Sequence, residues 1–480
     1  MESEKALHVV MFPWLAMGHL RPFLHMSKIL AQKGHKISFV STPRNIQRLP
    51  KLPVELAPFI NFVALALPEV DNLSPHEESS MDIPISKYQL LKIAFDLLKS
   101  DLATFLENLR PKPDWIFYDY VSHWLPSLAA DLGISTSYLC LFSAACMAFL
   151  GAPSFLMSGG DGRLTIEDYT VVPKWVPFPS CVAYHFHEVM RNMAGESGME
   201  SGTPDPVRFG ASVGGCDLVL LRTSIEFEPE YFNLVCELYQ KPVVPIGFLP
   251  QSSTSENNDC DEKWGFIKEW LDMQRVNSVV YVALGSEVVL THEELVELAH
   301  GLELCGLPFF WVIREPAWST HDKSQLSLLP KGFVERVRSR GIVHVGWVPQ
   351  VKILSHLAVG GFLTHCGWNS VIEALGFGRV LILLPVMNDQ GLNSRLLKEK
   401  KVGVEIPRNE KNGAFTRDSV VDALRIAMES QEGESLRARA REMRGVFGDG
   451  IRNDRYIDTV VTQLVNIRAS HLKSDKKFLM

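Results

Sequence analysis

The sequence predicts an α/β fold of two doubly wound, Rossmann-like domains that face each other across a cleft. Nearly unbroken apolar segments alternate with segments of helical periodicity, as in parallel sheets that helices cover on both faces. This alternation stops at a polar stretch, residues 249–264, and then starts again. The chain of 480 residues also exceeds the ~250–300 residues that a single hydrophobic core usually serves.

The first half opens with a strand–loop–helix–strand unit. The apolar run LHVVMFPWLAMGH (7–19) precedes RPFLHMSKILAQKGH (21–35), in which apolar residues recur at helical spacing up to a closing glycine. KISFVSTP (36–43) is then a second strand. Two later apolar segments are expected to extend the same sheet, DWIFYD (114–119) and CDLVLLRTS (216–224).

The second half repeats this pattern. SVVYVALGS (278–286) is a predicted strand, and THEELVELAHGLELCG (291–306) is a predicted amphipathic helix that Thr291 caps together with Glu294. Four further strands follow: PFFWVIRE (308–315), GIVHVGWVP (341–349), GGFLTHCG (360–367) and RVLILLPV (379–386). We therefore divide the chain into a first domain (1–248), a linker (249–264), a second domain (265–455) and a C-terminal helix and tail (456–480).

Composition and charge argue against several classes of protein. A net charge of −7 and the lack of a basic stripe argue against nucleic-acid binding. No apolar segment approaches the ~20 residues of a transmembrane helix, and the start MESEKALHVV lacks the regions of a signal peptide. The eight cysteines form no CxxC pair, so neither a disulfide scaffold nor a zinc ribbon is indicated. We expect a cytosolic protein that acts as a monomer.

The stretch FLTHCGWNS (362–370) is the strongest candidate for a binding loop. It lies between a predicted strand and a predicted helix, whose N-terminus offers unpaired N–H groups to an anion such as phosphate. His365, Asn369 and Ser370 add donors there, and Glu373 lies one turn beyond Asn369, where a carboxylate accepts from ribose hydroxyls. The alternative needs no ligand, because Ser370 and Glu373 also match a capping box.

Two other chemistries fit this loop poorly. Cys366 has no paired base to activate it, and the adjacent His365 and Cys366 are poor geometry for zinc, which takes three or four ligands. Elsewhere, the Asp-x-Asp triplet of residues 259–261 could hold a metal, but it lies in the polar linker with no strand before it. We interpret the triplet as a solvated charge run and expect no metal.

The wider context carries a family resemblance. From Trp347 to Gln390 the chain reads WVPQVKILSHLAVGGFLTHCGWNSVIEALGFGRVLILLPVMNDQ. This segment resembles the signature box of the plant family 1 UDP-dependent glycosyltransferases in length and at most positions. The resemblance extends to FPWLAMGHLRPFLHMSKILAQKGHKISFVSTPRN, WIFYDYVSHWLPSLAADLGI and SVVYVALGSE. One departure is Gly378-Arg379-Val380, where the family usually has Gly-x-Pro, and we expect it to leave donor binding intact.

The resemblance implies a GT-B-type fold in which the second domain (265–455) binds a UDP-sugar and the first (1–248) binds the acceptor. It implies that Trp347 stacks on uracil, that the Val348 backbone pairs with the edge of the base, and that Gln350 and Glu373 hold the ribose. The implied diphosphate ligands are His365, Asn369, Ser370 and Ser286, with Gly367 in the same loop. The residues implied to face the sugar are Trp368, Asp389 and Gln390. Apart from the resemblance, the helical pattern within residues 456–480 could pack on either domain, and packing back on the first domain is the alternative that we expect.

His19 and Asp119 are the candidate catalytic residues. Each follows a predicted strand of the first domain, and a buried carboxylate can orient an imidazole and stabilise its charged form. A single histidine among 15 is more often structural, but the resemblance implies that His19 is the general base and Asp119 its partner. It also implies one direct displacement that inverts the anomeric carbon, without a covalent intermediate and without a cofactor or metal.

The most specific expectation is transfer of a hexose to a hydroxyl of a small lipophilic metabolite of flavonoid, terpenoid or steroid type, or of its glycoside. Gln390 is associated by resemblance with glucose, and rhamnose is the alternative. An acceptor pocket is expected around residues 141–157 and 182–193, and Glu287 is a hypothetical contact for hydroxyls. An epimerase or hydrolase of UDP-sugars, or a non-catalytic binder, would fit the donor box but leave His19 with Asp119 unexplained.

Overall fold

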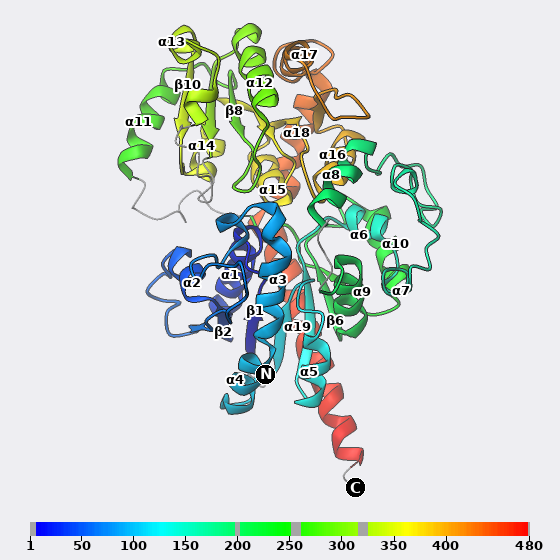
Figure 1. The fold of residues 1–480 in the computed structure, drawn as a ribbon. Coiled ribbons are helices and arrows are strands. Elements are labelled where there is room, and N and C mark those ends of the chain that lie inside the picture. Colours follow the sequence, from blue (N-terminus) through cyan, green and yellow to red (C-terminus); the bar gives the residue numbers. More distant parts are fainter. Residues whose placement is uncertain (1–5, 197–201, 251–260, 315–324, 479–480) are drawn as a thin grey trace. The chain divides into compact units, whose positions relative to one another are not determined.

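The structure is a computed structural model that describes residues 6–196, 202–250, 261–314 and 325–478. The chain divides into two compact units (Figure 1). The first contains residues 1–163, 195–249 and 450–480, and the second contains residues 164–194 and 250–449. Residues 251–260 of the predicted linker, including Asp259 and Cys260, lie outside the described residues.

The first unit is built on a seven-stranded parallel sheet of order β3-β2-β1-β4-β5-β6-β7. Its strands are β1 (His8–Phe12), β2 (Lys36–Ser41), β3 (Ile60–Ala64), β4 (Trp115–Tyr118), β5 (Ser135–Cys140), β6 (Leu218–Leu221) and β7 (Val243–Pro245). Almost every residue of the central strands is buried, as the unbroken apolar runs predicted. The strand order reverses between β1 and β4, which pair directly.

Helices cover both faces of this sheet (Figure 1). They are α1 (Met17–Gln32), α2 (Pro43–Arg48), α3 (Tyr88–Leu97), α4 (Lys99–Asn108), α5 (Leu125–Asp131), α6 (Ala144–Leu150), α7 (Pro153–Ser158), α9 (Asp205–Gly215), α10 (Pro229–Tyr239) and α19 (Gly450–Phe478). On one face, Val9 belongs to the same core cluster as apolar residues of α1 and α19. On the other, Phe12 stacks on Phe95 of α3, with ring centroids 4.8 Å apart.

The second unit contains a six-stranded parallel sheet of order β10-β9-β8-β11-β12-β13. Its strands are β8 (Val279–Ala283), β9 (Phe309–Ile313), β10 (Gly341–Val345), β11 (Val359–Thr364), β12 (Val380–Leu383) and β13 (Gly403–Glu405). The strand order reverses between β8 and β11, so both sheets share the Rossmann arrangement. The predicted doubly wound fold is therefore confirmed for each unit.

The helices of the second unit are α8 (Phe186–Glu196), α11 (Asp261–Asp272), α12 (His292–Cys305), α13 (Phe333–Val337), α14 (Gln350–Ser355), α15 (Trp368–Gly376), α16 (Gln390–Glu399), α17 (Arg417–Met428) and α18 (Glu434–Phe447). The Thr291 side chain caps α12 and forms the predicted capping box with Glu294. Short 3₁₀ turns complete the two units at Ser80–Asp82, Ile85–Lys87, Glu167–Tyr169 and Gln325–Leu328.

The grouping of two segments differs from their order along the chain. Residues 164–194, which the sequence analysis placed in the first domain, group with the second unit. Residues 450–480 group with the first unit, although they follow the whole second unit in sequence. The reason in the second case is apolar burial, because Ile457, Val460 and Leu464 of α19 lie in the core of the first unit.

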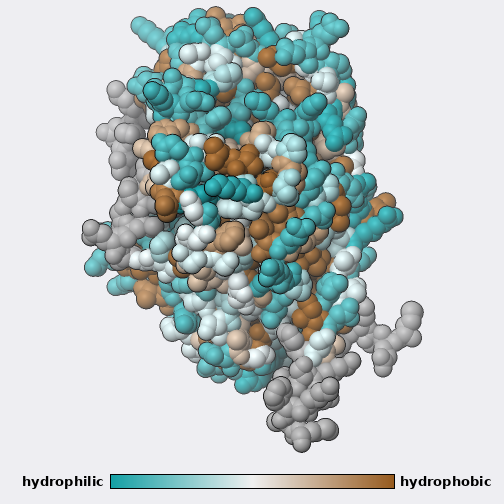
Figure 2. Space-filling model, turned by 90° about the vertical axis from the view of Figure 1, so that its right-hand side faces the viewer, coloured by the Kyte–Doolittle hydropathy of each residue, from teal (hydrophilic) through white to brown (hydrophobic). Residues whose placement is uncertain are grey.

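Among the described residues, no helix has both the length and the apolar character needed to cross a membrane. On the face of the molecule drawn in Figure 2, hydrophobic residues occur in patches among many hydrophilic ones. Polar atoms cannot cover the whole surface of a folded protein, so apolar residues on such a face need no special explanation.

Asn453 fixes the start of α19 to the strand end beyond β7. Its side-chain oxygen accepts from the backbone N–H groups of Phe248 (2.8 Å) and Leu249 (2.9 Å), and the side chain is buried. Asn453→Ala leaves both N–H groups without this acceptor, so we expect the free energy of unfolding to fall by about 2–4 kcal/mol in urea titrations. Asn453→Asp keeps an acceptor and should lose less, and the exposed Asn466→Ala is the control on the same helix. Equal losses for Asn453→Ala and Asn466→Ala would contradict the assignment.

Candidate active site

The first unit brings His19 and Asp119 together, although they are 100 residues apart in sequence. They follow the neighbouring strands β1 and β4, at the point where the strand order reverses. His19 Nδ1 lies 2.9 Å from Asp119 Oδ2. His19 follows the first strand as predicted, and it lies in the first turn of α1, which begins at Met17.

The hydrogen bonds of this pair identify the nitrogen that carries the proton. Asp119 Oδ2 also accepts from the backbone N–H of Trp14 at 2.9 Å. A carboxylate oxygen only accepts, so Nδ1 of His19 is the nitrogen that donates to Asp119. In the neutral form of this ring, Nε2 keeps its lone pair. Asp119 is 2% exposed whereas the His19 side chain is 18% exposed, so a buried acid anchors a ring that solvent can reach.

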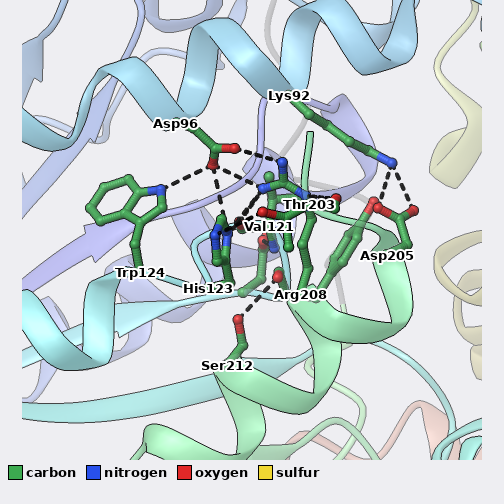
Figure 3. A network of polar contacts seen from close by, with 11 residues as sticks. Lys92, Asp96, Val121, His123, Trp124, Thr203, Asp205, Arg208 and Ser212 are labelled. Atoms are coloured by element: carbon green, nitrogen blue, oxygen red, sulfur yellow. Dashed lines mark hydrogen bonds and ion pairs between the residues drawn. The ribbon is translucent and has the colours of Figure 1, made fainter. Parts of the chain in front are cut away.

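A buried arginine holds the loop that follows β4. Arg208 of α9 is fully buried, and its guanidinium donates to the carbonyl oxygen of Val121 (2.9 Å) and to both carboxylate oxygens of Asp96 (2.8 and 2.6 Å). Figure 3 shows Arg208 among these partners. One turn along α9, the Ser212 hydroxyl donates to the carbonyl oxygen of Tyr120 (3.0 Å). Helix α9 therefore fixes the backbone immediately after the acidic residue of the pair.

Three aromatic side chains gather beside His19. The rings of Tyr120 and Phe142 lie 6.1 and 6.2 Å from the imidazole, centroid to centroid. Phe209 of α9 stacks on Tyr120 at 4.4 Å and also contacts Phe142 at 5.3 Å. All three are only partly buried, so they form an apolar surface next to the imidazole. Tyr120 and Phe209 were not predicted, because no motif marks an aromatic residue as a wall rather than as core.

The predicted acceptor segments divide between core and surface. Within residues 141–157, the side chains of α6 from Ala144 to Phe149 are buried and belong to the core, whereas Phe142 is partly exposed. Residues 182–193, which contain most of α8, belong to the second unit. The sequence could not separate these cases, since apolar residues suit both a core and an apolar pocket.

The second unit places its predicted phosphate ligands at the matching position of its own sheet. Ser286 follows β8 and His365 follows β11, the neighbours between which the strand order reverses. Two glycines make room for the histidine ring. A Cβ atom at Gly285 would lie 2.7 Å from His365 Nε2, and one at Gly367 would lie 2.5 Å from it. Glu287 is partly exposed in the same turn as Ser286.

His365 is a neutral donor. Burial lowers its pKa to about 4, so the imidazole carries no charge at pH 7 in the ligand-free protein. Its Nδ1 atom is buried and has no hydrogen-bond partner within the described part of the chain. A neutral imidazole still has one N–H to donate, and the N-terminus of α15 lies next to it in the chain.

Gln350 and Glu373 form the centre of the predicted ribose site. Gln350 Nε2 donates to Glu373 Oε2 (2.7 Å) and to Ser370 Oγ (3.2 Å). The hydroxyl of Tyr281 donates to Gln350 Oε1 (3.3 Å) from β8. Tyr281 was not predicted as a site residue, because within an apolar strand nothing distinguishes its hydroxyl from that of a core tyrosine.

The capping-box interpretation of Ser370 and Glu373 is wrong. Helix α15 begins at Trp368, and its N-cap is Gly367, which makes no side-chain cap. Ser370 is therefore inside the helix, where it accepts from Gln350 instead. Asn369 is the second residue of the same helix.

The two tryptophans of the box have different surroundings. Trp347 is 37% exposed, which leaves indole surface for a planar base, while the adjacent Val348 side chain is buried. The guanidinium carbon of Arg314, after β9, lies 4.3 Å from the Trp347 ring centroid. The ring of Trp368 is buried against Phe447 of α18, and its contact with a sugar stays a prediction. Its backbone N–H lies at the start of α15.

Asp389 and Gln390 lie at the turn between β12 and α16. Gln390 Oε1 accepts from the backbone N–H groups of Val386 and Met387, both at 3.0 Å, so the side chain is folded over the turn. Its amide nitrogen is then the group that can donate to a sugar hydroxyl. Asp389 Oδ2 accepts from Asn393 Nδ2 at 2.8 Å.

Arg379, part of the departure from the family pattern, lies at the opposite edge of the sheet. It directly precedes β12, whereas the residues predicted to bind the UDP-sugar follow the carboxyl ends of the strands. Its buried guanidinium donates to the carbonyl oxygens of Leu354 (2.7 Å) and His356 (3.1 Å) at the end of α14. Burial lowers its pKa to about 10. Its role is therefore to pack α14 against the sheet.

The thiol of Cys366 in the loop is fully buried. Burial raises the pKa of the Cys366 thiol well above its usual value, which disfavours the nucleophilic thiolate. Within the described ranges, no three His, Cys, Asp or Glu side chains are grouped as metal ligands. The seven cysteines of these ranges are free thiols.

Known proteins similar to this chain are UDP-sugar transferases, in agreement with the arrangement of the predicted site residues. The model of the family "UDP-glucoronosyl and UDP-glucosyl transferase" matches residues 220–433. UDP-glycosyltransferase 91C1 of Arabidopsis thaliana is 55% identical over 462 residues, which cover 96% of this chain and 97% of the relative. Soyasaponin III rhamnosyltransferase of Glycine max is 41% identical, with 97% of each chain covered. A structure titled Phytolacca americana UGT2 complexed with UDP-2fluoro-glucose and pterostilbene superposes with a TM-score of 0.75 at 25% identity, covering 96% of this chain and 100% of that one.

The two relatives and the solved structure match nearly the whole chain, and they agree with two Rossmann-like units of the GT-B type. The protein belongs to the plant family 1 UDP-dependent glycosyltransferases. It is therefore an enzyme whose class uses a UDP-sugar, and the family predicted from the signature box is confirmed. The roles of the individual site residues remain predictions.

The low pKa of His365 predicts how its ring titrates. In the ligand-free protein we expect the ring to stay neutral down to about pH 5, with a midpoint near 4. Histidine-labelled NMR spectra, with His365→Asn to assign the signal, measure this midpoint. Because the unfolded chain takes up this proton near pH 6.5, stability should fall as the pH drops from 6.5 towards 4. A midpoint above 6 would show that the ring is not desolvated as the structure indicates.

Proposed function

We propose that the protein transfers a hexose from a UDP-sugar to a hydroxyl of a small lipophilic plant metabolite or of its glycoside, with inversion of the anomeric carbon. The observation that carries the proposal is the His19–Asp119 pair, bonded at 2.9 Å at the switch point of the first sheet. Nucleotide-sugar binding alone would not require a base oriented by a buried acid.

The pair supports a general-base mechanism. The acceptor hydroxyl gives its proton to His19 Nε2, while Nδ1–H stays bonded to Asp119. The acceptor oxygen forms a bond to the anomeric carbon as the bond between that carbon and the diphosphate oxygen breaks, and UDP leaves with the electron pair. Asp119 stabilises the imidazolium that forms. Since no bond to the protein forms, the anomeric carbon is inverted in one step.

Charge on the leaving UDP is met by donors of the second unit. His365, the backbone N–H groups at the start of α15 and Ser286 supply neutral hydrogen bonds at one edge of the sheet. Trp347 stacks on uracil, and the bonded pair of Gln350 and Glu373 holds the ribose hydroxyls. We expect this set to act without a divalent metal.

Glucose is the favoured sugar and rhamnose is the second candidate. Gln390 matches the family position associated with glucose, and the Phytolacca americana relative is titled as a complex with a fluorinated UDP-glucose. The Glycine max relative is named as a rhamnosyltransferase. An acceptor with an apolar ring suits the surface formed by Tyr120, Phe142 and Phe209 next to the base.

A donor and acceptor screen tests the proposal. UDP-glucose and UDP-rhamnose are each incubated with flavonoid, terpenoid and steroid aglycones and their monoglucosides, with and without EDTA. We expect a β-linked product from α-linked UDP-glucose in at least one pairing, and equal rates in EDTA. Release of free sugar without acceptor would indicate a hydrolase, interconversion of UDP-sugars an epimerase, and binding without turnover a non-catalytic binder. Activity that is lost in EDTA and returns with Mg²⁺ or Mn²⁺ would contradict metal independence.

Substitution of the base should separate chemistry from donor binding. His19→Ala removes the proton acceptor, so we expect kcat to fall about 10²–10⁴-fold. The UDP dissociation constant should stay unchanged, because the proposed UDP ligands all belong to the other unit. Asp119→Asn should lower kcat as well, since an amide does not stabilise the imidazolium. Near-normal turnover of His19→Ala on an alcohol acceptor would refute the assignment.

A further inference from the structure

Helix α8 contacts the turn that carries the predicted sugar-facing residues. The Asn192 side chain donates to the carbonyl oxygen of Asn388 (3.2 Å) and accepts from the backbone N–H of Asn388 (2.7 Å). One side-chain amide thus bonds both backbone groups of a single residue. Asn388 immediately precedes Asp389 and Gln390.

Asn388 has a backbone conformation that needs support. Its φ of 54° lies in the left-handed region, which asparagine tolerates better than most residues but still at a cost. The two hydrogen bonds from Asn192 stabilise this conformation. Since the peptide planes on either side of Asn388 are then fixed, the direction in which the chain enters residues 389–390 is fixed as well.

A second contact of α8 lies on the other side of the same two residues. The carboxylate of Glu188 packs against Gly391, where a Cβ atom would lie 2.4 Å from Glu188 Oε2. Glu188 also accepts from Arg395 of α16 at 2.5 Å, and both side chains are buried. Arg395 pairs with Glu405 of β13 too, so its charge is compensated. The contacts of α8 at Asn388 and Gly391 therefore bracket Asp389 and Gln390.

The polar groups within the bracket have little freedom. Gln390 Oε1 is used by Val386 and Met387, and Asp389 Oδ2 by Asn393. Hexoses differ in the presence or direction of single hydroxyls, so discrimination depends on how rigidly such groups are placed. Any tilt of the turn moves the Gln390 amide and the Asp389 carboxylate together.

We propose that Asn192 is a positioning residue that sets the choice of donor sugar by holding Asn388, and through it Asp389 and Gln390, in place. The inference rests on the proposed function, in which these two residues face the sugar of the UDP-sugar. Asn192 itself does not touch the reacting atoms in this account. A merely structural tie would lower stability and would affect all donors and UDP alike.

The test compares Asn192→Ala with Met273→Ala, a control in the same unit whose side chain is exposed and lies outside every predicted site. Dissociation constants for UDP, UDP-glucose and UDP-rhamnose are measured by calorimetry, and kcat and KM are measured for both sugars. Losing two hydrogen bonds should raise the KM and Kd of the preferred UDP-sugar roughly 5–20-fold. The UDP constant should change less than about twofold, and the ratio of kcat/KM between the two sugars should fall at least about fivefold. Met273→Ala should match the wild type in every value.

A variant that keeps one of the two hydrogen bonds, together with the dissociation constants, distinguishes positioning of the sugar-facing residues from a general structural role. Asn192→Asp still accepts from the Asn388 N–H but no longer donates, so its effect should be intermediate. An unchanged sugar ratio in Asn192→Ala, or an equal loss for UDP and both UDP-sugars, would overturn the inference. If the wild type transfers neither sugar, the proposed function is what fails. The ratio of UDP-sugar to UDP affinity then still decides the role of Asn192.

Discussion

In each sheet the strand order reverses once, and the groups proposed to do chemistry lie at that reversal. Connections between parallel strands are right-handed, so the helices that follow the two central strands pass to opposite faces. The carboxyl ends of those strands are then left with a crevice that no crossover helix fills. In the first unit the reversal joins β1 to β4, and in the second it joins β8 to β11. The placement of His19 beside Asp119, and of Ser286 near His365, follows from this constraint.

The loops at such a crevice need support from the residues packed beneath them, and in this protein buried arginines provide it. Arg208 fixes the loop after β4, and Arg395 links α8 to α16 and β13. A buried charge that lost its partners would be strongly destabilising, so each arginine has buried or partly buried carboxylates around it. Burying each arginine costs desolvation free energy, which its carboxylate partners offset. In return, the directional hydrogen bonds of the guanidinium fix the loop positions more specifically than apolar packing would.

The sequence was sufficient for what depends on one strand and its neighbours. The apolar runs indicated β1, β4, β8 and β11 and hence the loops that carry the site. The sequence was insufficient where a residue distant in the chain, rather than a neighbour, forms the hydrogen bond to a polar side chain. The local sequence around Ser370 matches a helix cap, but its hydroxyl oxygen instead accepts a hydrogen bond from Gln350, 20 residues earlier. Short strands such as β7 were missed too, because three residues carry too little periodicity. Helix α8 was misplaced because its partners lie about 200 residues further along the chain.

The position of α19 has a consequence for biosynthesis. The apolar residues Ile457, Val460, Val461 and Leu464 complete a core whose other members lie between Leu7 and Leu249. They are translated only after the entire second unit. During synthesis the first sheet therefore leaves the ribosome with one face partly uncovered, and it stays so until the last helix arrives. The nascent chain must pass through a stage that exposes apolar surface, which is the kind of species that chaperones bind.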